Sequence, residues 1–224
     1  PRLLTGKGRY LDDINYDRQL YAVILRSPHA HADIVSINTD AAKVAPGVHA
    51  VLTGQDYRDD GMGVVPCMGN YTRRDGSPMY IPDRPALAVG RVRNIGYPVV
   101  LVVADTESEA RDASELIDVE YSPLPAVTSC YEAFKDGAPQ LYDDCPNNES
   151  YFYEAGGKAA TDAAFDKADH VVSQHLVINR VTANAMENRG VIGDFNPATD
   201  AAKPEEHSID LWMRMQLHLL VRLV

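Results

Sequence analysis

Residues 98–109 read PVVLVVADTESE, and this stretch decides the fold of the first half of the chain. The run Pro98–Ala104 is apolar at every position, which is typical of a strand buried on both faces. Thr106 follows the run, and Glu109 stands three residues later, a spacing that predicts a capping box at the start of a helix. An apolar stripe at helical spacing comes next, so residues 98–117 are predicted to form a strand followed directly by a helix.

The neighbouring segments extend this pattern in both directions. Residues 118–121 alternate polar and apolar side chains after the helix, which predicts a βαβ-type unit. Upstream, the apolar or alternating segments 20–26, 33–38 and 48–53 read as strands, with a short helix at 39–44. A glycine-rich turn between strand and helix is absent from the βαβ-type unit, so the sequence lacks a dinucleotide-binding fingerprint there.

The remaining segments are less regular. Residues 55–86 are rich in Gly, Pro, Asp and Arg and are predicted to form a long surface excursion. Residues 126–157 have the Pro, Asp, Asn and Gly content of an extended connection. Beyond it the sequence predicts a helix at 159–168 and an apolar, β-branched strand at 171–181. The last apolar segment has no room to finish an element, so we expect the chain to be truncated.

Composition limits the classes of function. The 224 residues are 45% apolar and 24% charged, which is typical of a folded, water-soluble protein. The net charge of -11, without a basic cluster, argues against nucleic acid or an anionic membrane surface as partner. Apolar runs stay well short of the roughly 20 residues needed to cross a bilayer, so we expect no membrane span.

The three cysteines are widely spaced at Cys67, Cys130 and Cys145. They form neither an even disulfide framework nor a Cys-x-x-Cys element, which indicates a reducing, cytoplasmic compartment. Because iron–sulfur clusters are held mainly by cysteine thiolates, this chain alone is not expected to hold one.

Residues 26–32, RSPHAHA, place two histidines two positions apart directly after an apolar strand. If the segment stays extended, His29 and His31 share one face and can hold a metal such as zinc. Alternatively, the pair lies in a structural turn, because Pro28 ends the strand and no third ligand follows at a suitable spacing. We favour the turn. A metal-dependent hydrolase built on the two histidines, and a non-catalytic interaction domain, remain alternatives.

Several segments taken together resemble a known family. Residues 5–13 (TGKGRYLDD), 26–32 (RSPHAHA) and 179–187 (NRVTANAME) resemble, in this order, the start of one subunit type. This is the molybdopterin-binding large subunit of the xanthine dehydrogenase and aldehyde oxidase family, and its carbon-monoxide-dehydrogenase-like branch is most similar. Residues 92–125 are similar to that family's strand, helix and strand ending in a Tyr-x-x-Leu-Pro turn.

The resemblance implies an α+β fold in three parts. Residues 1–125 are expected to form the aldehyde oxidase and xanthine dehydrogenase α/β hammerhead domain. Residues 126–157 are then an extended connection, and residues 158–224 are the truncated start of the first molybdopterin-binding domain.

The resemblance also implies a reaction and a set of partners. Family members oxidise a small organic molecule (an aldehyde, a purine or another N-heterocycle) or CO, with water as the oxygen source. The implied cofactor is molybdenum-molybdopterin, in its cytosine dinucleotide form, held mostly by sequence outside this chain. The implied partners are the rest of the large subunit and the 2Fe-2S and FAD domains or subunits, in a cytoplasmic dimer of heterotrimers.

One cofactor-binding residue carries over from the family. A Ser-Thr-Gln segment places its glutamine near the molybdenum oxo ligand, and the matching position here is Gln216. An amide suits this role because its NH2 donates to an oxo group without adding a charge. The sequence departs from the family at Arg214 and Met215, which replace the small hydroxyl pair, at His218-Leu219, which replaces Pro-His, and at Tyr97, where a glutamate is frequent.

The family's catalytic machinery lies elsewhere. Its glycine-rich cofactor loop and its catalytic glutamate occur beyond the position of residue 224. The resemblance therefore assigns no catalytic residue and no metal ligand to this chain, and we expect the fragment alone to be inactive.

Overall fold

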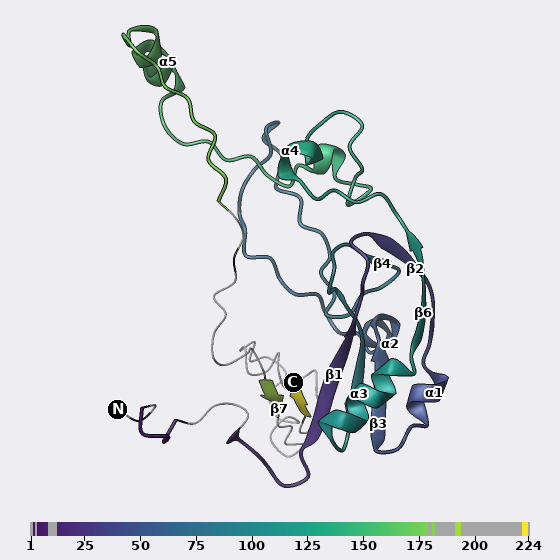
Figure 1. Cartoon of the computed structure of the whole chain (residues 1–224). Coiled ribbons are helices and arrows are strands. Elements are labelled where there is room, and N and C mark those ends of the chain that lie inside the picture. The colour runs from purple at the N-terminus through teal and green to yellow at the C-terminus, as the bar shows by residue number, and fades with distance from the viewer. Residues whose placement is uncertain are drawn as a thin grey trace.

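A computed structural model describes residues 13–178 together with 2, 4–8, 181, 191–193 and 221–223. Its elements form two β-sheets, with helices on and between them (Figure 1). The strands are β1 (Leu20–Arg26), β2 (Ala32–Asn38), β3 (Val48–Thr53), β4 (Arg91–Val92), β5 (Pro98–Ala104), β6 (Asp118–Pro123), β7 (Val191–Gly193) and β8 (Val221–Leu223). The helices are α1 (Asp40–Lys43), α2 (Gly54–Asp59), α3 (Glu107–Glu115), α4 (Cys130–Ala133), the 3-10 turn η2 (Pro146–Asn148) and α5 (Lys158–Asp166). Within the described residues, no helix has the length and apolar character needed to cross a membrane.

The first sheet has the strand order β3-β5-β1-β8-β7, and β5 is its organising strand. β5 runs antiparallel to both β1 and β3, so that Val102 lies opposite Val23 on one side and Val51 on the other. Val99, Val100 and Val102 are fully buried. α3 packs across β1, β5 and β3 and covers one face of this sheet (Figure 1). The burial of β5 confirms the strand predicted at residues 98–104.

On its other side β1 pairs with the far end of the sequence. β8 lies parallel to β1, with Leu20 opposite Val221 and Ala22 opposite Leu223, and β7 pairs antiparallel with β8. The predicted strands 20–26, 33–38 and 48–53 and the short helix at 39–44 are likewise confirmed as β1, β2, β3 and α1.

Two helix starts show how local chemistry ends one element and begins the next. At α3, the Thr106 hydroxyl accepts from the Glu109 N–H at 3.2 Å and donates to the Glu109 carboxylate at 2.7 Å. The carboxylate therefore binds the threonine side chain. At α2, Thr53 and Asp56 make a full reciprocal capping box, because the Asp56 carboxylate accepts from the Thr53 N–H at 2.7 Å. The sequence predicted the start of α3 correctly, but the capping box predicted there is wrong in one half, because Glu109 binds the Thr106 hydroxyl and not its backbone N–H. The full box at α2 was not predicted.

The second sheet has the order β4-β2-β6, with antiparallel pairing throughout. The prediction of a βαβ-type unit is therefore wrong, because β5 and β6 belong to different sheets and β6 pairs with β2. The physical reason lies in the strand patterns. β5 is apolar on both faces and needs cover on both, whereas β6 alternates and places Val119 and Tyr121 opposite Ile37 and Ile34 of β2.

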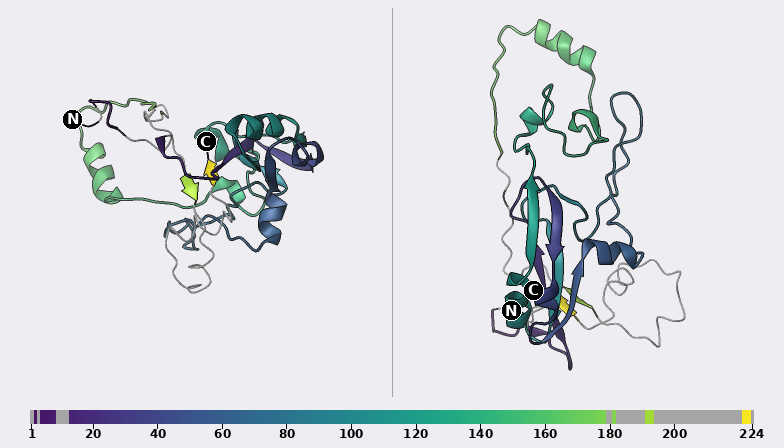
Figure 2. Two further views of the ribbon diagram at one scale, coloured as in Figure 1. Left: turned by 90° about the horizontal axis from the view of Figure 1, so that it is seen from below. Right: turned by 90° about the vertical axis from the view of Figure 1, so that its right-hand side faces the viewer.

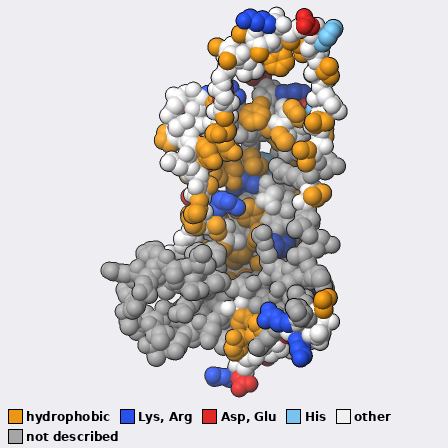
Figure 3. All heavy atoms as spheres, turned by 90° about the vertical axis from the view of Figure 1, so that its left-hand side faces the viewer, with side chains coloured by type: hydrophobic (Ala, Val, Ile, Leu, Met, Phe, Trp, Pro, Cys, Tyr) orange, Lys and Arg blue, Asp and Glu red, His pale blue; other side chains and the backbone are white. Residues whose placement is uncertain are grey.

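Residues 153–178 form an arm whose residues are all exposed, with α5 near its tip (Figures 1 and 2). α5 confirms the helix predicted at 159–168. The strand predicted at 171–181 is wrong over 171–178, where the structure has no strand. Val172 and Ile178 are 91% and 93% exposed, so the apolar pattern is present without a neighbouring strand to pair with. Figure 3 shows hydrophobic side chains spread over this upper part of the molecule.

Replacing Val102 by alanine tests the dependence of the fold on β5. The substitution removes two fully buried methyl groups between β1 and β3, so we expect the free energy of unfolding to fall by roughly 2 kcal/mol. The matched control is Val44→Ala, because Val44 is 83% exposed. The control should change stability by less than about 0.5 kcal/mol. Equal denaturation midpoints for the two variants in urea would contradict the central place of β5.

The capping box at α2 predicts a pH dependence. Burial alone raises the pKa of Asp56, but hydrogen bonds from Thr53 outweigh it, so the pKa lies below the ordinary 3.8. A carboxylate whose pKa is lowered by folding stabilises the protein above pH 3.8, and this contribution is lost as the pH falls through the folded pKa. Asp56→Asn should therefore flatten the acid limb of a stability curve measured by urea unfolding. An unchanged acid limb would show that the box adds no net stability.

Candidate functional site

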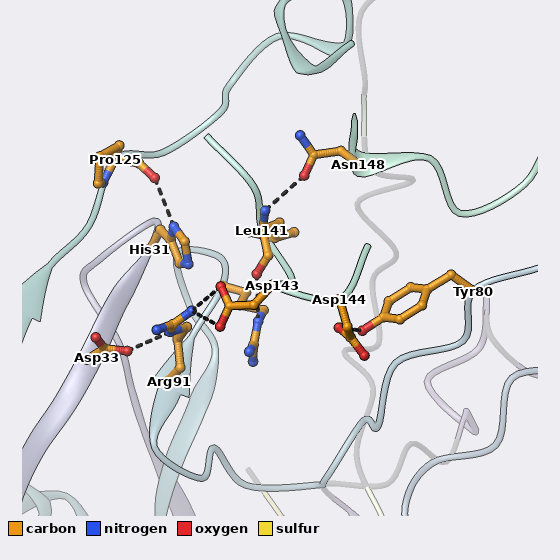
Figure 4. A network of polar contacts seen from close by, with 10 residues as sticks. His31, Asp33, Tyr80, Arg91, Pro125, Leu141, Asp143, Asp144 and Asn148 are labelled. Atoms are coloured by element: carbon orange, nitrogen blue, oxygen red, sulfur yellow. Dashed lines mark hydrogen bonds and ion pairs between the residues drawn. The ribbon is translucent and has the colours of Figure 1, made fainter. Parts of the chain in front are cut away.

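Residues 124–150, which we call the connection, follow β6. They fold back onto the second sheet and meet it next to the start of β2. The Leu124 N–H donates to the His31 carbonyl at 2.9 Å, and His31 Nδ1 lies 2.8 Å from the Pro125 carbonyl oxygen (Figure 4). Because a carbonyl only accepts, Nδ1 carries the hydrogen and donates. His31 Nε2 is buried and has no hydrogen-bond partner among the described residues.

The structure gives the two histidines of the RSPHAHA segment different neighbours. They lie in the bend between β1 and β2, which confirms the predicted turn. The His29 N–H donates to the Ser27 hydroxyl at 3.0 Å, and the His29 ring packs 4.8 Å from the Tyr121 ring, measured between centroids. In the described part of the chain, no group of three or more His, Cys, Asp or Glu side chains is placed to hold a metal. The arrangement gives the hydrolase alternative no support.

Arg91, at the start of β4, links the sheet to the connection. Its guanidinium binds the Asp33 carboxylate of β2 through Nε and reaches both Asp143 oxygens at 3.3 Å through a terminal nitrogen (Figure 4). The hydrogen bond to Asp33 raises the pKa of Arg91 further. Because the Asp143 side chain is 83% exposed, the Asp33 contact is the stronger of the two.

Arg93 and Asn148 hold the backbone of the connection at Leu141. The Arg93 Nε donates to the Leu141 carbonyl at 3.0 Å, and the Asn148 side-chain oxygen accepts from the Leu141 N–H at 2.9 Å. The Asn148 amide nitrogen donates to the carbonyls of Ala133 and Pro139. Asn148 has a φ of 55°, a left-handed conformation that asparagine tolerates better than most residues.

Tyr80 ties the long excursion to the same connection. Its hydroxyl donates to the Asp144 carboxylate at 2.6 Å (Figure 4), and its backbone pairs with Ser150, whose hydroxyl donates to the Tyr80 carbonyl at 2.8 Å. Burial and the Asp144 hydrogen bond raise the pKa of Tyr80. The phenol therefore stays protonated and acts as a donor at neutral pH.

The predicted site residues divide into those the structure describes and those it does not. Gln216, the cofactor-binding candidate, lies outside the described residues. Tyr97, the departure from the family's glutamate, packs against the buried cluster around β5, and burial raises its pKa. Sequence reading missed Arg91 and Arg93. The Arg-Val-Arg alternation around the fully buried Val92 places both arginines on one face and could have indicated them.

Together these contacts bind backbone groups of residues 124, 125, 133, 139 and 141 and fix the connection to the second sheet. The geometry therefore defines a class of structure: a hammerhead-like pair of β-sheets with a connection that side-chain hydrogen bonds hold in place. The family described as "Aldehyde oxidase and xanthine dehydrogenase, a/b hammerhead domain" matches residues 5–125, more than half of the chain. The chain therefore belongs to the aldehyde oxidase and xanthine dehydrogenase family, as the N-terminal hammerhead region of its large subunit.

Relatives and solved structures agree with this assignment. The nicotine 6-hydroxylase large subunit of Paenarthrobacter nicotinovorans is 38% identical over 99% of this chain and 25% of the relative. The carbon monoxide dehydrogenase large chain of Hydrogenophaga pseudoflava is 35% identical over 88% of this chain and 24% of the relative. This chain thus spans about a quarter of the length of these curated relatives.

Two solved structures share the fold. The reconstituted CO dehydrogenase from Oligotropha carboxidovorans is 33% identical, covers 75% of this chain and 21% of the solved one, and superposes with a TM-score of 0.61. Quinoline 2-oxidoreductase from Pseudomonas putida 86 is 40% identical, covers 63% of this chain and 17% of the solved one, and gives a TM-score of 0.55.

A pair of asparagine variants tests the bracing of the connection. Asn147 and Asn148 both have left-handed φ angles, 58° and 55°, so glycine relieves the same backbone constraint at each. Asn148→Gly also removes three hydrogen bonds, and we expect it to destabilise the connection by roughly 2 kcal/mol. Hydrogen exchange at the Leu141 amide measures the effect, and Asn147→Gly is the control. Equal protection of Leu141 in both variants would show that the Asn148 side chain does not brace it.

Proposed function

We propose that this chain forms the N-terminal part of the large subunit of a molybdenum-cofactor hydroxylase or dehydrogenase. In the complete enzyme, a small organic molecule is oxidised with water as the source of oxygen. The observation that carries this proposal is the family match over residues 5–125 together with a hydroxylase large subunit that aligns along 99% of the chain.

The described residues serve this enzyme as scaffold. Their polar groups bind one another and the backbone of the connection, and no described cluster is placed to hold a metal. They do not fit the molybdenum cofactor, and no step of the reaction is assigned to them. We place molybdenum-molybdopterin, in its cytosine dinucleotide form, mostly on polypeptide outside this chain.

Gln216 is the one position of this chain that we propose as a cofactor contact. The support is the family resemblance of its segment and the chemistry of the amide, which donates hydrogen bonds and adds no charge. Its proposed role is to hydrogen-bond the edge of the cofactor, while groups outside this chain carry out the reaction.

The substrate class that we propose first is an N-heterocycle. Two relatives support it by their names: the nicotine 6-hydroxylase large subunit at 38% identity and quinoline 2-oxidoreductase at 40%. An aldehyde, a purine or CO is the wider range of the family, and the carbon monoxide dehydrogenase large chains at 35% and 31% identity keep CO within it. Oxidation of CO would require copper beside molybdenum.

The proposed assembly follows from the same relatives. They are described as a large subunit, a large chain and a subunit of a dehydrogenase complex. We propose iron–sulfur and FAD subunits or domains as partners, together with the rest of the large subunit, in a cytoplasmic dimer of heterotrimers.

Purification of the complex that contains this chain tests the proposed function. We expect stoichiometric molybdenum by metal analysis, and dye reduction that depends on an N-heterocycle such as quinoline, with oxygen-18 from labelled water in the product. Detection of copper together with CO-dependent dye reduction would identify CO as the substrate instead. A complex without molybdenum and without dye reduction on heterocycles, aldehydes, purines or CO would refute the oxidoreductase assignment.

Gln216 is tested in the same complex. Gln216→Leu should lower the rate of dye reduction by roughly tenfold or more, because it removes a hydrogen-bond donor beside the reacting metal centre. Gln55→Leu is the matched control, since Gln55 lies on α2 and its side chain binds only Asp59 among the described residues. A Gln216 variant with the activity and molybdenum content of the control would remove this residue from the cofactor site.

A further inference from the structure

A cavity of about 560 Å³ lies where the second sheet meets the connection. Ala30 and His31, in the bend before β2, form part of its wall, and so do Pro82 of the long excursion and residues 126–130 of the connection. Its volume falls within the roughly 300–1,000 Å³ that is usual for small-molecule sites. The proposed function assigns no role to these residues.

Arg93 supplies the positive charge in this cavity. Its Nε is occupied by the Leu141 carbonyl, and its guanidinium carbon lies 4.4 Å from the centre of the Tyr142 ring. Arg93 makes no ion pair with any described residue, whereas Arg91, two residues earlier, binds two carboxylates. In a chain with 32 acidic and 21 basic residues, a half-buried arginine that lines a cavity without a carboxylate partner points to an anionic ligand.

Two hydroxyl groups stand on the connection side of the cavity. Thr128 and Ser129 both line it, and the Ser129 side chain does not cap the helix that follows. Among the described residues, neither hydroxyl has a hydrogen-bond partner. A carboxylate held by Arg93 can accept further hydrogen bonds from such groups, because each of its oxygens has two lone pairs.

Much of the remaining wall is apolar or aromatic. The Tyr80 and Tyr142 rings lie 5.6 Å apart between centroids, and Val127, Ala133 and Leu141 contribute aliphatic side chains. The Tyr80 hydroxyl is already bound to Asp144, so its ring is what it offers to a ligand. The two rings are tilted by 57° and contact each other, so a planar ligand packs against them from the cavity side.

His31 is not available to bind the negatively charged group of a ligand. Its Nδ1 donates to the Pro125 carbonyl, and its Nε2 is buried inside the wall. The negative group of a ligand therefore belongs at the Arg93 end, and the planar body belongs against the apolar wall to which Tyr80 and Tyr142 contribute.

We propose that this cavity binds a small aromatic monocarboxylate, with Arg93 holding the carboxylate and Tyr80 and Tyr142 packing against the ring. One cation fits one negative charge, and the apolar wall favours an aromatic body over a small inorganic anion. A ligand held there contacts both the second sheet and the connection, so binding stabilises the braced arrangement by an amount that grows with the logarithm of ligand concentration. This inference is independent of the proposed oxidoreductase function.

The probe is benzoate, titrated by calorimetry into the complete large subunit within its complex. We expect saturable binding that is about tenfold tighter than that of the neutral isostere benzamide, because the carboxylate adds a charge-assisted bond to Arg93. Inorganic phosphate is the second comparison, and it should bind more weakly because it lacks the ring. Equal affinity for benzoate and benzamide, or for benzoate and phosphate, would overturn the proposal, and so would the absence of saturable binding.

The protein-side test uses two arginine variants. Arg93→Gln should weaken benzoate binding by about tenfold and leave benzamide binding unchanged. Arg111→Gln is the matched control, because Arg111 is exposed on α3, pairs with Glu107 and does not line the cavity. If Arg93→Gln does not fold, the comparison of benzoate with benzamide on the unaltered protein tests the proposal instead. Unchanged benzoate affinity in a folded Arg93→Gln protein overturns the proposal. If benzoate does not bind the complex and the Arg93→Gln variant releases a partner subunit, Arg93 binds that subunit and not a small ligand, which also overturns the proposal.

Discussion

The pairing of β5 on both of its edges is the constraint on which the rest of the structure depends. A strand that is apolar on both faces must be covered above, below and at both sides, and β1, β3 and α3 together supply most of this cover. With both edges of β5 occupied, β6 cannot pair beside it, and it pairs with β2 in the second sheet instead. That pairing sets where the connection after β6 begins.

The second dependence is on hydrogen bonding outside regular elements. The connection between residues 124 and 150 has little secondary structure, so its backbone groups need partners from side chains. His31 and Arg93 provide some of them from outside the connection, and Asn148 provides others from a left-handed turn within it. This bracing gives the second sheet and the connection a shared surface, which includes the cavity at Arg93.

How far the sequence could predict this structure depends on the range of the interactions involved. Strands and helices with a strong local pattern, such as residues 98–104 and the start of α3, were predicted correctly because their signals lie within a few residues. The βαβ-type interpretation failed because sheet membership depends on pairing between β2 and β6, some 85 residues apart along the chain. The Asp33–Arg91 and Asp143 contacts were missed for the same reason. The strand at 171–181 was mispredicted because its apolar pattern has no described partner strand. Gln216 rests on resemblance alone, since the structure does not describe it.

The parallel pairing of β8 with β1 has a consequence for synthesis on the ribosome. The segment β1 to β5 can close as soon as about 105 residues have emerged, but Leu20 and Ala22 gain their β8 neighbours only after residue 223. Until then one edge of β1 offers unpaired N–H and C=O groups to any other extended chain. Nascent protein therefore passes through a stage at which chaperones, or neighbouring chains on the same messenger RNA, compete for that edge.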